Sequence, residues 1–277
     1  SCLARPKNFA GMHFFNPANV MKLLENVRAG ATAPDVLATV TATGKRIGKV
    51  PVLVGRSEGF VANRMLSKRS REAQFLLEDG ATPQQVDRVL VEFGFPIGPF
   101  ALADLAGMDV MAATRAARLA SMTPREQACD IVDKLAAAGR LGQKSGAGYY
   151  RCDENRKPLP DPVVDDMLAS HRAERGLPRR DIGDEEILER CLYAMVNEAA
   201  RILDEGAAER AGDIDVIWTN GFGWPAYLGG PMFWADQIGL PDIRKALVKY
   251  SGLVGETYFK PAALIDRLVQ TGGGFLD

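Results

Sequence analysis

The stretch GMHFFNPANVMKLLENVRAG, residues 11–30, carries the main clues to the fold. Residues 9–15 form a short apolar run that favours a buried strand, and residues 20–28 favour a second one. Asn16-Pro17 marks a turn between them, because a residue that precedes proline is pushed out of the helical region. In an antiparallel pair turning around residue 19, residues whose numbers sum to 38 lie opposite each other, as His13 and Glu25 would.

The periodicity on the carboxyl side of this stretch changes from strands to helices. Residues 31–49 are typical of a helix with Pro34 near its first turn, and VPVLVG (50–55) is a β-branched run typical of a buried strand. Residues 1–56 therefore predict a β-β-α-β order, which is the end of an α/β domain. From Gly59 onward apolar residues recur at helical spacing, so the rest of the fold is predicted to be mainly α.

The helical part contains an internal repeat. Residues 71–90 match residues 197–218, and residues 95–107 match residues 224–239, in the same order and with an offset that drifts only from 126 to 132. The matched pairs are Glu72 with Glu198, Gly80 with Gly206, Asp87 with Asp215, Pro96 with Pro225, Asp104 with Asp236 and Gly107 with Gly239. We therefore predict two duplicated all-helical units, joined by a polar, proline-rich connector.

Composition excludes several classes of protein. The 34 basic residues balance 35 acidic ones, which gives no basic footprint for nucleic acid. The longest apolar runs are too short for a membrane span, and two histidines cannot build a histidine-rich metal site. Four scattered cysteines favour a reducing intracellular setting. Because the sequence also shows no signal peptide or targeting tail, we expect a cytoplasmic protein without nucleic-acid partner, membrane span or metal.

His13 and Glu25 are the first candidates for chemistry. Residues opposed in an antiparallel pair have Cβ atoms roughly 4.5–5.5 Å apart, so an imidazole–carboxylate hydrogen bond is within reach. A carboxylate there would fix the tautomer of His13 and favour its charged form, as a general base requires. Taken alone, the spacing favours a simpler structural alternative: a buried histidine bound to a backbone carbonyl, and a glutamate at a strand end.

Three motifs occur in a characteristic order: GMHFFNP (11–17), GFVANR (59–64) and GQKSGAGYY (142–150). This series resembles the L-3-hydroxyacyl-CoA dehydrogenase family, in which the first motif ends the Rossmann-like NAD-binding domain and the second opens a helical domain. The duplicated helical part is similar to the carboxyl-terminal region of multifunctional fatty-acid β-oxidation enzymes, where an enoyl-CoA hydratase unit precedes the dehydrogenase. The predicted domains are thus a remnant of the NAD-binding domain (1–56), a first helical dehydrogenase domain (57–150), a linker (151–184) and a second, structural helical repeat (185–277).

The resemblance assigns roles to five residues. His13 matches the catalytic histidine, Glu25 the carboxylate paired with it, and Asn63 an asparagine that contacts the substrate. Asn16 matches an asparagine near the nicotinamide, and Lys144 a cofactor-contacting lysine. Taken alone, Asn63 is also compatible with an ordinary polar residue in a first helical turn, Asn16 with a turn residue before Pro17, and Lys144 with a solvated lysine among glycines.

The resemblance implies an enzyme that oxidises L-3-hydroxyacyl-CoA to 3-ketoacyl-CoA with NAD, with a homodimer partner or a thiolase as possible partners. The chain has no G-x-G-x-x-G motif, and the family's active-site serine would fall before Ser1. We therefore expect a fragment that binds NAD weakly by itself. Two alternatives remain: a non-catalytic helical scaffold of a β-oxidation complex, and a dehydrogenase for short 3-hydroxybutyryl-CoA.

Overall fold

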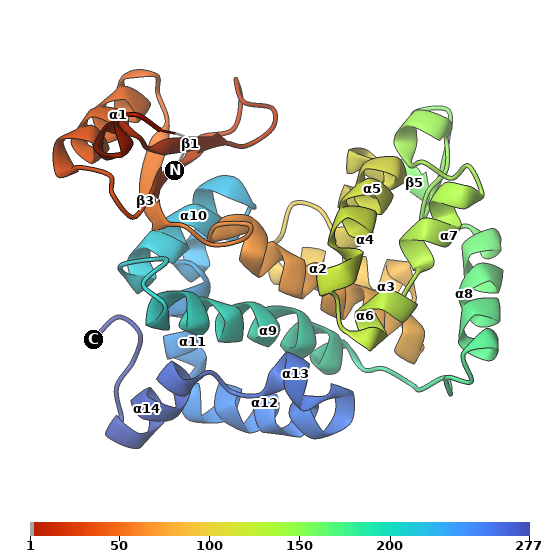
Figure 1. The fold of residues 1–277 in the computed structure, drawn as a ribbon. Coiled ribbons are helices and arrows are strands. Elements are labelled where there is room, and N and C mark those ends of the chain that lie inside the picture. Colours follow the sequence, from red (N-terminus) through yellow and green to blue (C-terminus); the bar gives the residue numbers. More distant parts are fainter. Residues whose placement is uncertain (1–2) are drawn as a thin grey trace. The chain divides into compact units, whose positions relative to one another are not determined.

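The structure is a computed structural model that describes residues 3–277. These residues form two compact units (Figure 1). The first unit contains the residues up to Arg69 together with Leu192–Asp277, and the second contains Ser70–Cys191. Helices α2 (Ala62–Asp79) and α9 (Asp184–Asp204) each continue from one unit into the other. The fold is mainly helical, as the sequence predicts.

The first unit opens with a three-stranded sheet in the order β1-β2-β3. Strand β1 (Gly11–Phe14) is antiparallel to β2 (Leu23–Arg28), which is parallel to β3 (Val50–Gly55). Helix α1 (Pro34–Arg46) links β2 to β3, so the predicted β-β-α-β order is confirmed. The register is also the predicted one, with His13 opposite Glu25, although both strands begin later than predicted.

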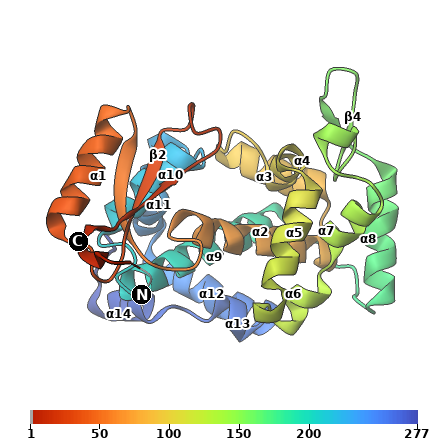
Figure 2. The ribbon, with the colours of Figure 1, turned by 45° about the horizontal axis from the view of Figure 1, so that its top comes forward.

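Helices cover both faces of this sheet. Consecutive strand residues point to opposite faces, so Leu23 and Leu24 of β2 mark the two sides. A Cβ added at Gly44 of α1 would meet Leu24, and one at Gly221 of α10 (Ala211–Gly221) would meet Leu23. Figure 2 accordingly shows α1 and α10 on either side of the strands. Glycine at both positions allows these helices to approach the sheet closely.

Helices α9 to α14 complete the first unit. Asn197 of α9 holds the segment before α14, donating to the carbonyl of Lys260 at 3.0 Å and accepting from the amide of Ala262 at 2.8 Å. Asp215 accepts from the amides of Met232 and Phe233 at the start of α11. The bounds of the remaining helices are α11 Pro231–Ile238, α12 Leu240–Val254, α13 Glu256–Phe259 and α14 Ala263–Thr271, with 3-10 turns at Pro6–Asn8 and Ala226–Leu228.

Two buried aspartates organise the second unit. Asp87 accepts from the amides of Phe100 and Ala101, which begin α4, and from the Tyr150 hydroxyl at 2.8 Å. Asp104 accepts from the amides of Tyr149 and Tyr150. The elements are α3 Pro83–Phe93, α4 Pro99–Ala106, α5 Met108–Arg118, α6 Pro124–Ala128, α7 Ile131–Ala137, β4 Arg151–Cys152, β5 Pro158–Leu159 and α8 Pro162–Glu174, with 3-10 turns at Leu119–Ser121 and Gln143–Ser145.

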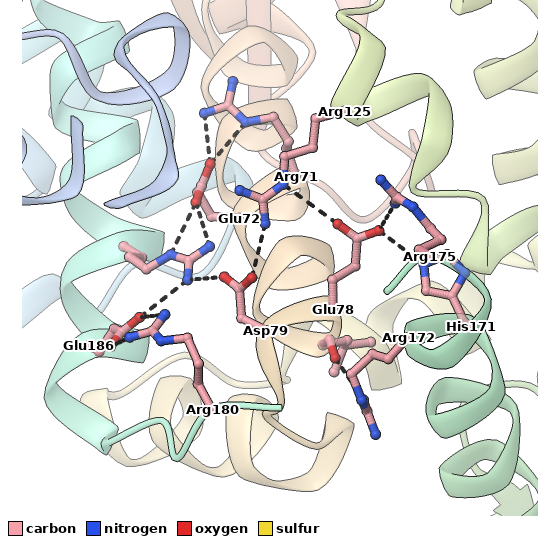
Figure 3. Close-up of polar contacts among 12 residues, drawn as sticks. Arg71, Glu72, Glu78, Asp79, Arg125, His171, Arg172, Arg175, Arg180 and Glu186 are labelled. Carbon is pink, nitrogen blue, oxygen red and sulfur yellow. Dashed lines mark hydrogen bonds and ion pairs between the residues drawn. The ribbon is translucent and has the colours of Figure 1, made fainter. Parts of the chain in front are cut away.

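Charged side chains fasten the connector 151–184 within the second unit (Figure 3). His171 of α8 lies 2.9 Å from Glu78, and Arg175 also pairs with this carboxylate. Asp79 accepts from Arg125 at 3.1 Å and from the fully buried Arg190 at 2.6 Å. Removing one partner of such a buried network leaves an uncompensated charge, so the network is a structural feature of this unit.

Among the described residues, no helix is long and apolar enough to cross a membrane.

Candidate active site

His13 and Glu25 form the centre of the candidate site in the first unit. The Nδ1 atom of His13 lies 2.8 Å from Oε2 of Glu25. The His13 side chain is 28% exposed, whereas that of Glu25 is 0% exposed. A solvent-accessible imidazole is therefore backed by a carboxylate that water does not reach.

The second carboxylate oxygen of Glu25 is held by the start of α2. Oε1 accepts from the amides of Val61 at 3.1 Å and Ala62 at 3.0 Å. These are among the amide groups that a helix leaves without an internal partner, and the positive end of the helix dipole favours an anion there. Glu25 therefore presents an oriented carboxylate to His13, although it is completely buried.

The local sequence explains why α2 begins beside Glu25. Gly59 and Phe60 both have positive φ, +75° and +50°, so the chain reverses sharply before the helix. Glycine adopts this region freely, whereas a phenylalanine does so only when its surroundings fix it. The Ser57 hydroxyl donates to the carbonyl of Phe60 at 2.8 Å, which supports the turn.

Aromatic rings enclose the imidazole. The ring of His13 lies 4.6 Å from that of Phe15 and 5.2 Å from that of Phe60. Phe15 in turn makes an edge-to-face contact with Phe222, which follows α10. These rings restrict the orientation of His13 in addition to its hydrogen bond with Glu25.

Of the three other candidate residues, Asn63 and Asn16 lie in the first unit, and Lys144 lies in the second. Asn63 is exposed in the first turn of α2, directly after Ala62, and therefore lies close to the pair of His13 and Glu25. Asn16 is exposed in the loop that follows β1.

Lys144 belongs to the second unit, where its ammonium group pairs with Asp109. Both side chains are about half exposed, and the hydrogen bond from Lys144 lowers the pKa of Asp109. Lys144 is thus a surface lysine with an acidic partner, and its predicted contact with a cofactor stays a prediction.

This arrangement is suited to proton transfer. When Nδ1 of His13 donates to Glu25, Nε2 is the unprotonated ring nitrogen, which can accept a proton. The carboxylate then stabilises the imidazolium that forms, in the way that a general base requires. We assign the proton to Nδ1 because its hydrogen-bond partner, Oε2 of Glu25, is an acceptor.

The amides of Val61 and Ala62 belong to the site without any sequence motif that marks them. The motif GFVANR directed attention to the Asn63 side chain, whereas the backbone before it carries the anion-binding groups. His13 can bind only one carboxylate oxygen of a buried Glu25, so the other oxygen needs its own hydrogen-bond donors. This requirement indicates that further donors lie nearby, although it does not say which ones.

Comparison with known proteins identifies the family. The model described as "3-hydroxyacyl-CoA dehydrogenase, C-terminal domain" matches residues 59–152 and 187–273. The chain belongs to the 3-hydroxyacyl-CoA dehydrogenase family. The model described as "3-hydroxyacyl-CoA dehydrogenase, NAD binding domain" matches residues 1–57.

Similar curated proteins are much longer than this chain. A peroxisomal bifunctional enzyme of Danio rerio is 42% identical over 284 residues, which cover 97% of this chain and 39% of the relative. The peroxisomal bifunctional enzyme of Homo sapiens is 45% identical over 89% of this chain and 36% of its own length. A peroxisomal fatty acid beta-oxidation multifunctional protein of rice is 38% identical, with 92% and 36% covered. The chain thus spans less than two fifths of these relatives.

Two solved structures share the fold over nearly the whole chain. The dehydrogenase part of multifunctional enzyme 1 from C. elegans has a TM-score of 0.71 and 32% identity, covering 96% of this chain and 60% of that one. A 3-hydroxybutyryl-CoA dehydrogenase from Escherichia coli has a TM-score of 0.79 and 26% identity, covering 98% and 73%.

Proposed function

We propose that this protein oxidises L-3-hydroxyacyl-CoA to 3-ketoacyl-CoA with NAD, as the dehydrogenase part of a multifunctional fatty-acid β-oxidation enzyme. The observation that carries the proposal is the accessible His13 imidazole, bound to a buried Glu25 whose other oxygen is fixed by two amides of α2. Family membership and the names of the relatives support the same activity.

The reaction removes a proton from the hydroxyl oxygen and a hydride from the carbon of the substrate. His13 accepts the proton at Nε2, while Glu25 stabilises the resulting cation and keeps the ring in the productive tautomer. Asn63 holds the reacting oxygen or the neighbouring thioester carbonyl through its amide group, which orients the substrate before reaction. NAD, when bound, supplies the hydride acceptor.

The residues of the first unit fit part of an NAD site. The β2-α1-β3 segment is a βαβ crossover with parallel strands, the unit from which dinucleotide-binding domains are built. The exposed amide of Asn16, three residues after His13, is suited to hydrogen bonding with a carboxamide such as that of nicotinamide. The 277 residues contain no glycine-rich phosphate-binding motif, so we assign no residue to the pyrophosphate.

The central test replaces His13 in the full-length protein. We expect H13A to lower kcat for oxidation of L-3-hydroxybutyryl-CoA by 10²-fold or more, because a positioned general base contributes about 10²–10⁴. NADH absorbance measures the rate, and thermal unfolding verifies that the variant is folded. Near-normal turnover by a folded H13A protein would rule out the proposed base.

We further propose that residues 57–150 and 185–277 are duplicated helical units, with residues 1–56 as a remnant of the NAD-binding domain and 151–184 as a linker. Equivalent aspartates support this. Asp87 and Asp215 each bind two amides at the start of the third helix of their unit. Asp104 and Asp236 each bind two consecutive amides further along the chain, at 149–150 and 275–276.

The second helical repeat, residues 185–277, has no residues that match His13, Glu25 and Asn63. By the 126 offset, Glu189 takes the position of Asn63, and neither histidine of the chain lies in or directly before residues 185–277 in a matching motif. This observation favours the alternative proposal, a helical scaffold that assembles with a thiolase or a second copy. Calorimetric titration of the 277-residue chain with NAD bears on the two proposals: micromolar binding favours the dehydrogenase, whereas weak binding agrees with both and leaves the decision to the His13 variant.

The acyl-CoA thioester is the proposed substrate, whereas a homodimer or thiolase partner remains a prediction. The location is also open to test. The cytoplasmic location that we expected differs from the peroxisomal or glyoxysomal names of the relatives. Fractionation of cells of the source organism distinguishes the two compartments.

A further inference from the structure

Arg64 links the candidate site to the proposed second helical repeat, residues 185–277. It follows Asn63 in the first turn of α2, and all three nitrogens of its guanidinium bind carboxylates. Nε donates to Glu198 at 2.6 Å, and the two terminal nitrogens donate to the two oxygens of Glu205 at 2.5 and 2.9 Å. Glu198 lies in α9, and Glu205 directly follows that helix.

The guanidinium of Arg64 and the carboxylate of Glu198 are largely buried, which limits the movement of both side chains. The side chains of Arg64 and Glu198 are 16% and 6% exposed, whereas Glu205 is about half exposed. Glu198 also pairs with Arg201 at 3.2 Å and with Lys68 at 3.9 Å. A bidentate arginine–carboxylate pair fixes both distance and angle, which a single contact does not.

The cluster keeps its charge over the working pH range. The hydrogen bond with Glu205 is the largest influence on Arg64 and raises its pKa, although burial opposes it. The same bond lowers the pKa of Glu205. Burial opposes ionisation of Glu198, but Lys68 and Arg64 outweigh it, so the pKa of Glu198 is lowered. Arg64 is therefore a permanent anchor rather than a pH switch.

We propose that Arg64 is a positioning residue of the dehydrogenase reaction, through which Glu198 and Glu205 fix the first turn of α2. This inference rests on the proposed function. The same turn supplies the amides of Val61 and Ala62 that hold Glu25, and it carries Asn63. Through Glu198 and Glu205, residues 185–277 thus influence the rate of the reaction by fixing the orientation of this turn.

Helix geometry explains why one arginine has this effect. Successive side chains on a helix are rotated by about 100°, so the direction of Arg64 determines that of Asn63. The first turn of a helix lacks some internal hydrogen bonds and is prone to fraying. A misplacement of about 1 Å at a reacting group can cost up to about 10²-fold in rate.

The test replaces Glu205, because Arg64 then keeps Glu198 and the variant should fold. We expect E205A in the full-length protein to lower kcat about tenfold, with KM changed less than about twofold, and E205Q to give an intermediate kcat. Hydrogen exchange of the peptide covering residues 59–66 should become several-fold faster in E205A. The matched control is E209A, which breaks the exposed Arg28–Glu209 pair of 2.8 Å in the same unit and should leave kcat and this exchange unchanged.

The outcomes separate the inference from the proposed function. Wild-type kcat and exchange in E205A would overturn the positioning role, as would an equal loss in E205A and E209A. A loss of thermal stability in E205A without a change in kcat would reduce the cluster to a structural contact and also overturn it. If the unsubstituted protein has no dehydrogenase activity, the proposed function fails, and the exchange comparison still decides whether Glu205 fixes the turn.

Discussion

Replacing Glu25 with Gln tests the candidate site most directly, because the two side chains have nearly the same shape. The carboxylate accepts three hydrogen bonds, from His13 and from the amides of Val61 and Ala62. A glutamine has one acceptor oxygen and one donor NH₂ group. Two amides fix its oxygen at the start of α2, so its NH₂ group faces Nδ1 of His13. That nitrogen must then accept, and the ring proton moves to Nε2, the atom proposed as the base.

The expected loss in E25Q follows from this reversed tautomer. A general base contributes about 10²–10⁴ to the rate, so a base in the wrong tautomer should lower kcat by about 10²-fold or more, which corresponds to about 2.7 kcal/mol. We expect a smaller effect of E25Q on the free energy of unfolding than on the activation free energy. The variant loses a charge-assisted hydrogen bond, worth roughly 1.5–3 kcal/mol, but no longer buries a charge.

Two measurements on E25Q check the argument. The kcat for L-3-hydroxybutyryl-CoA oxidation is followed across pH, with E209Q as the exposed control. Nitrogen NMR of labelled histidine reports the tautomer directly, and the two histidines of the chain keep the spectrum simple. An unchanged kcat and pH profile would refute the role of Glu25. A ring that keeps its proton on Nδ1 in E25Q would refute the tautomer argument even if kcat falls.

Two further predictions concern the helical part. Burial raises the pKa of Asp215 to about 6, although hydrogen bonds from the amides of Met232 and Phe233 lower it. The protonated form of Asp215 is therefore favoured in the folded protein, so the stabilisation is complete below about pH 4 and is lost as pH rises through about 6. A difference of this size corresponds to about 3 kcal/mol, and D215N should remove this part of the pH dependence in urea unfolding; an identical slope in both proteins would contradict it. A Cβ at Gly230 would lie 2.3 Å from Cβ of Asp215, so G230A should cost at least about 2 kcal/mol, whereas G212A in α10, where the added Cβ meets nothing, should be neutral or stabilise by up to about 1 kcal/mol. Equal melting temperatures for the two glycine variants would contradict the packing argument.

The hairpin register could be predicted from sequence because local rules determine it. Pro17 fixes the turn, and the apolar runs on both sides leave few alternative pairings, so His13 falls opposite Glu25. The other oxygen of Glu25 is different. Its partners lie 36 and 37 residues along the chain, and their position depends on where α2 begins after a turn with positive φ at Phe60. No local pattern encodes that approach.

Lys144 and the connector show a second limit. The motif around Lys144 suggested a cofactor contact, but motifs do not reveal an acidic neighbour such as Asp109, which is 35 residues away in sequence. The prolines and charges of the connector predict a linker. Its helix α8 buries Val164, Leu168 and His171, a helical stripe that becomes meaningful only when the acidic partner Glu78 is known.

The enzymatic and scaffold proposals place the same demand on residues 185–277. A buried carboxylate such as Glu25 is stable only where its surroundings are fixed, since a loosened site would admit water or protonate it. Part of that surrounding comes from residues 185–277, the proposed helical repeat. The amide of Gly55 in β3 donates to Ala207 at 2.7 Å, and Trp218 of α10 donates to the sulfur of Met65 in α2 at 3.2 Å. Residues 185–277, to which we assign no catalytic residue, thus help to complete the core in which Glu25 is held, so the scaffold proposal and the enzymatic proposal are compatible.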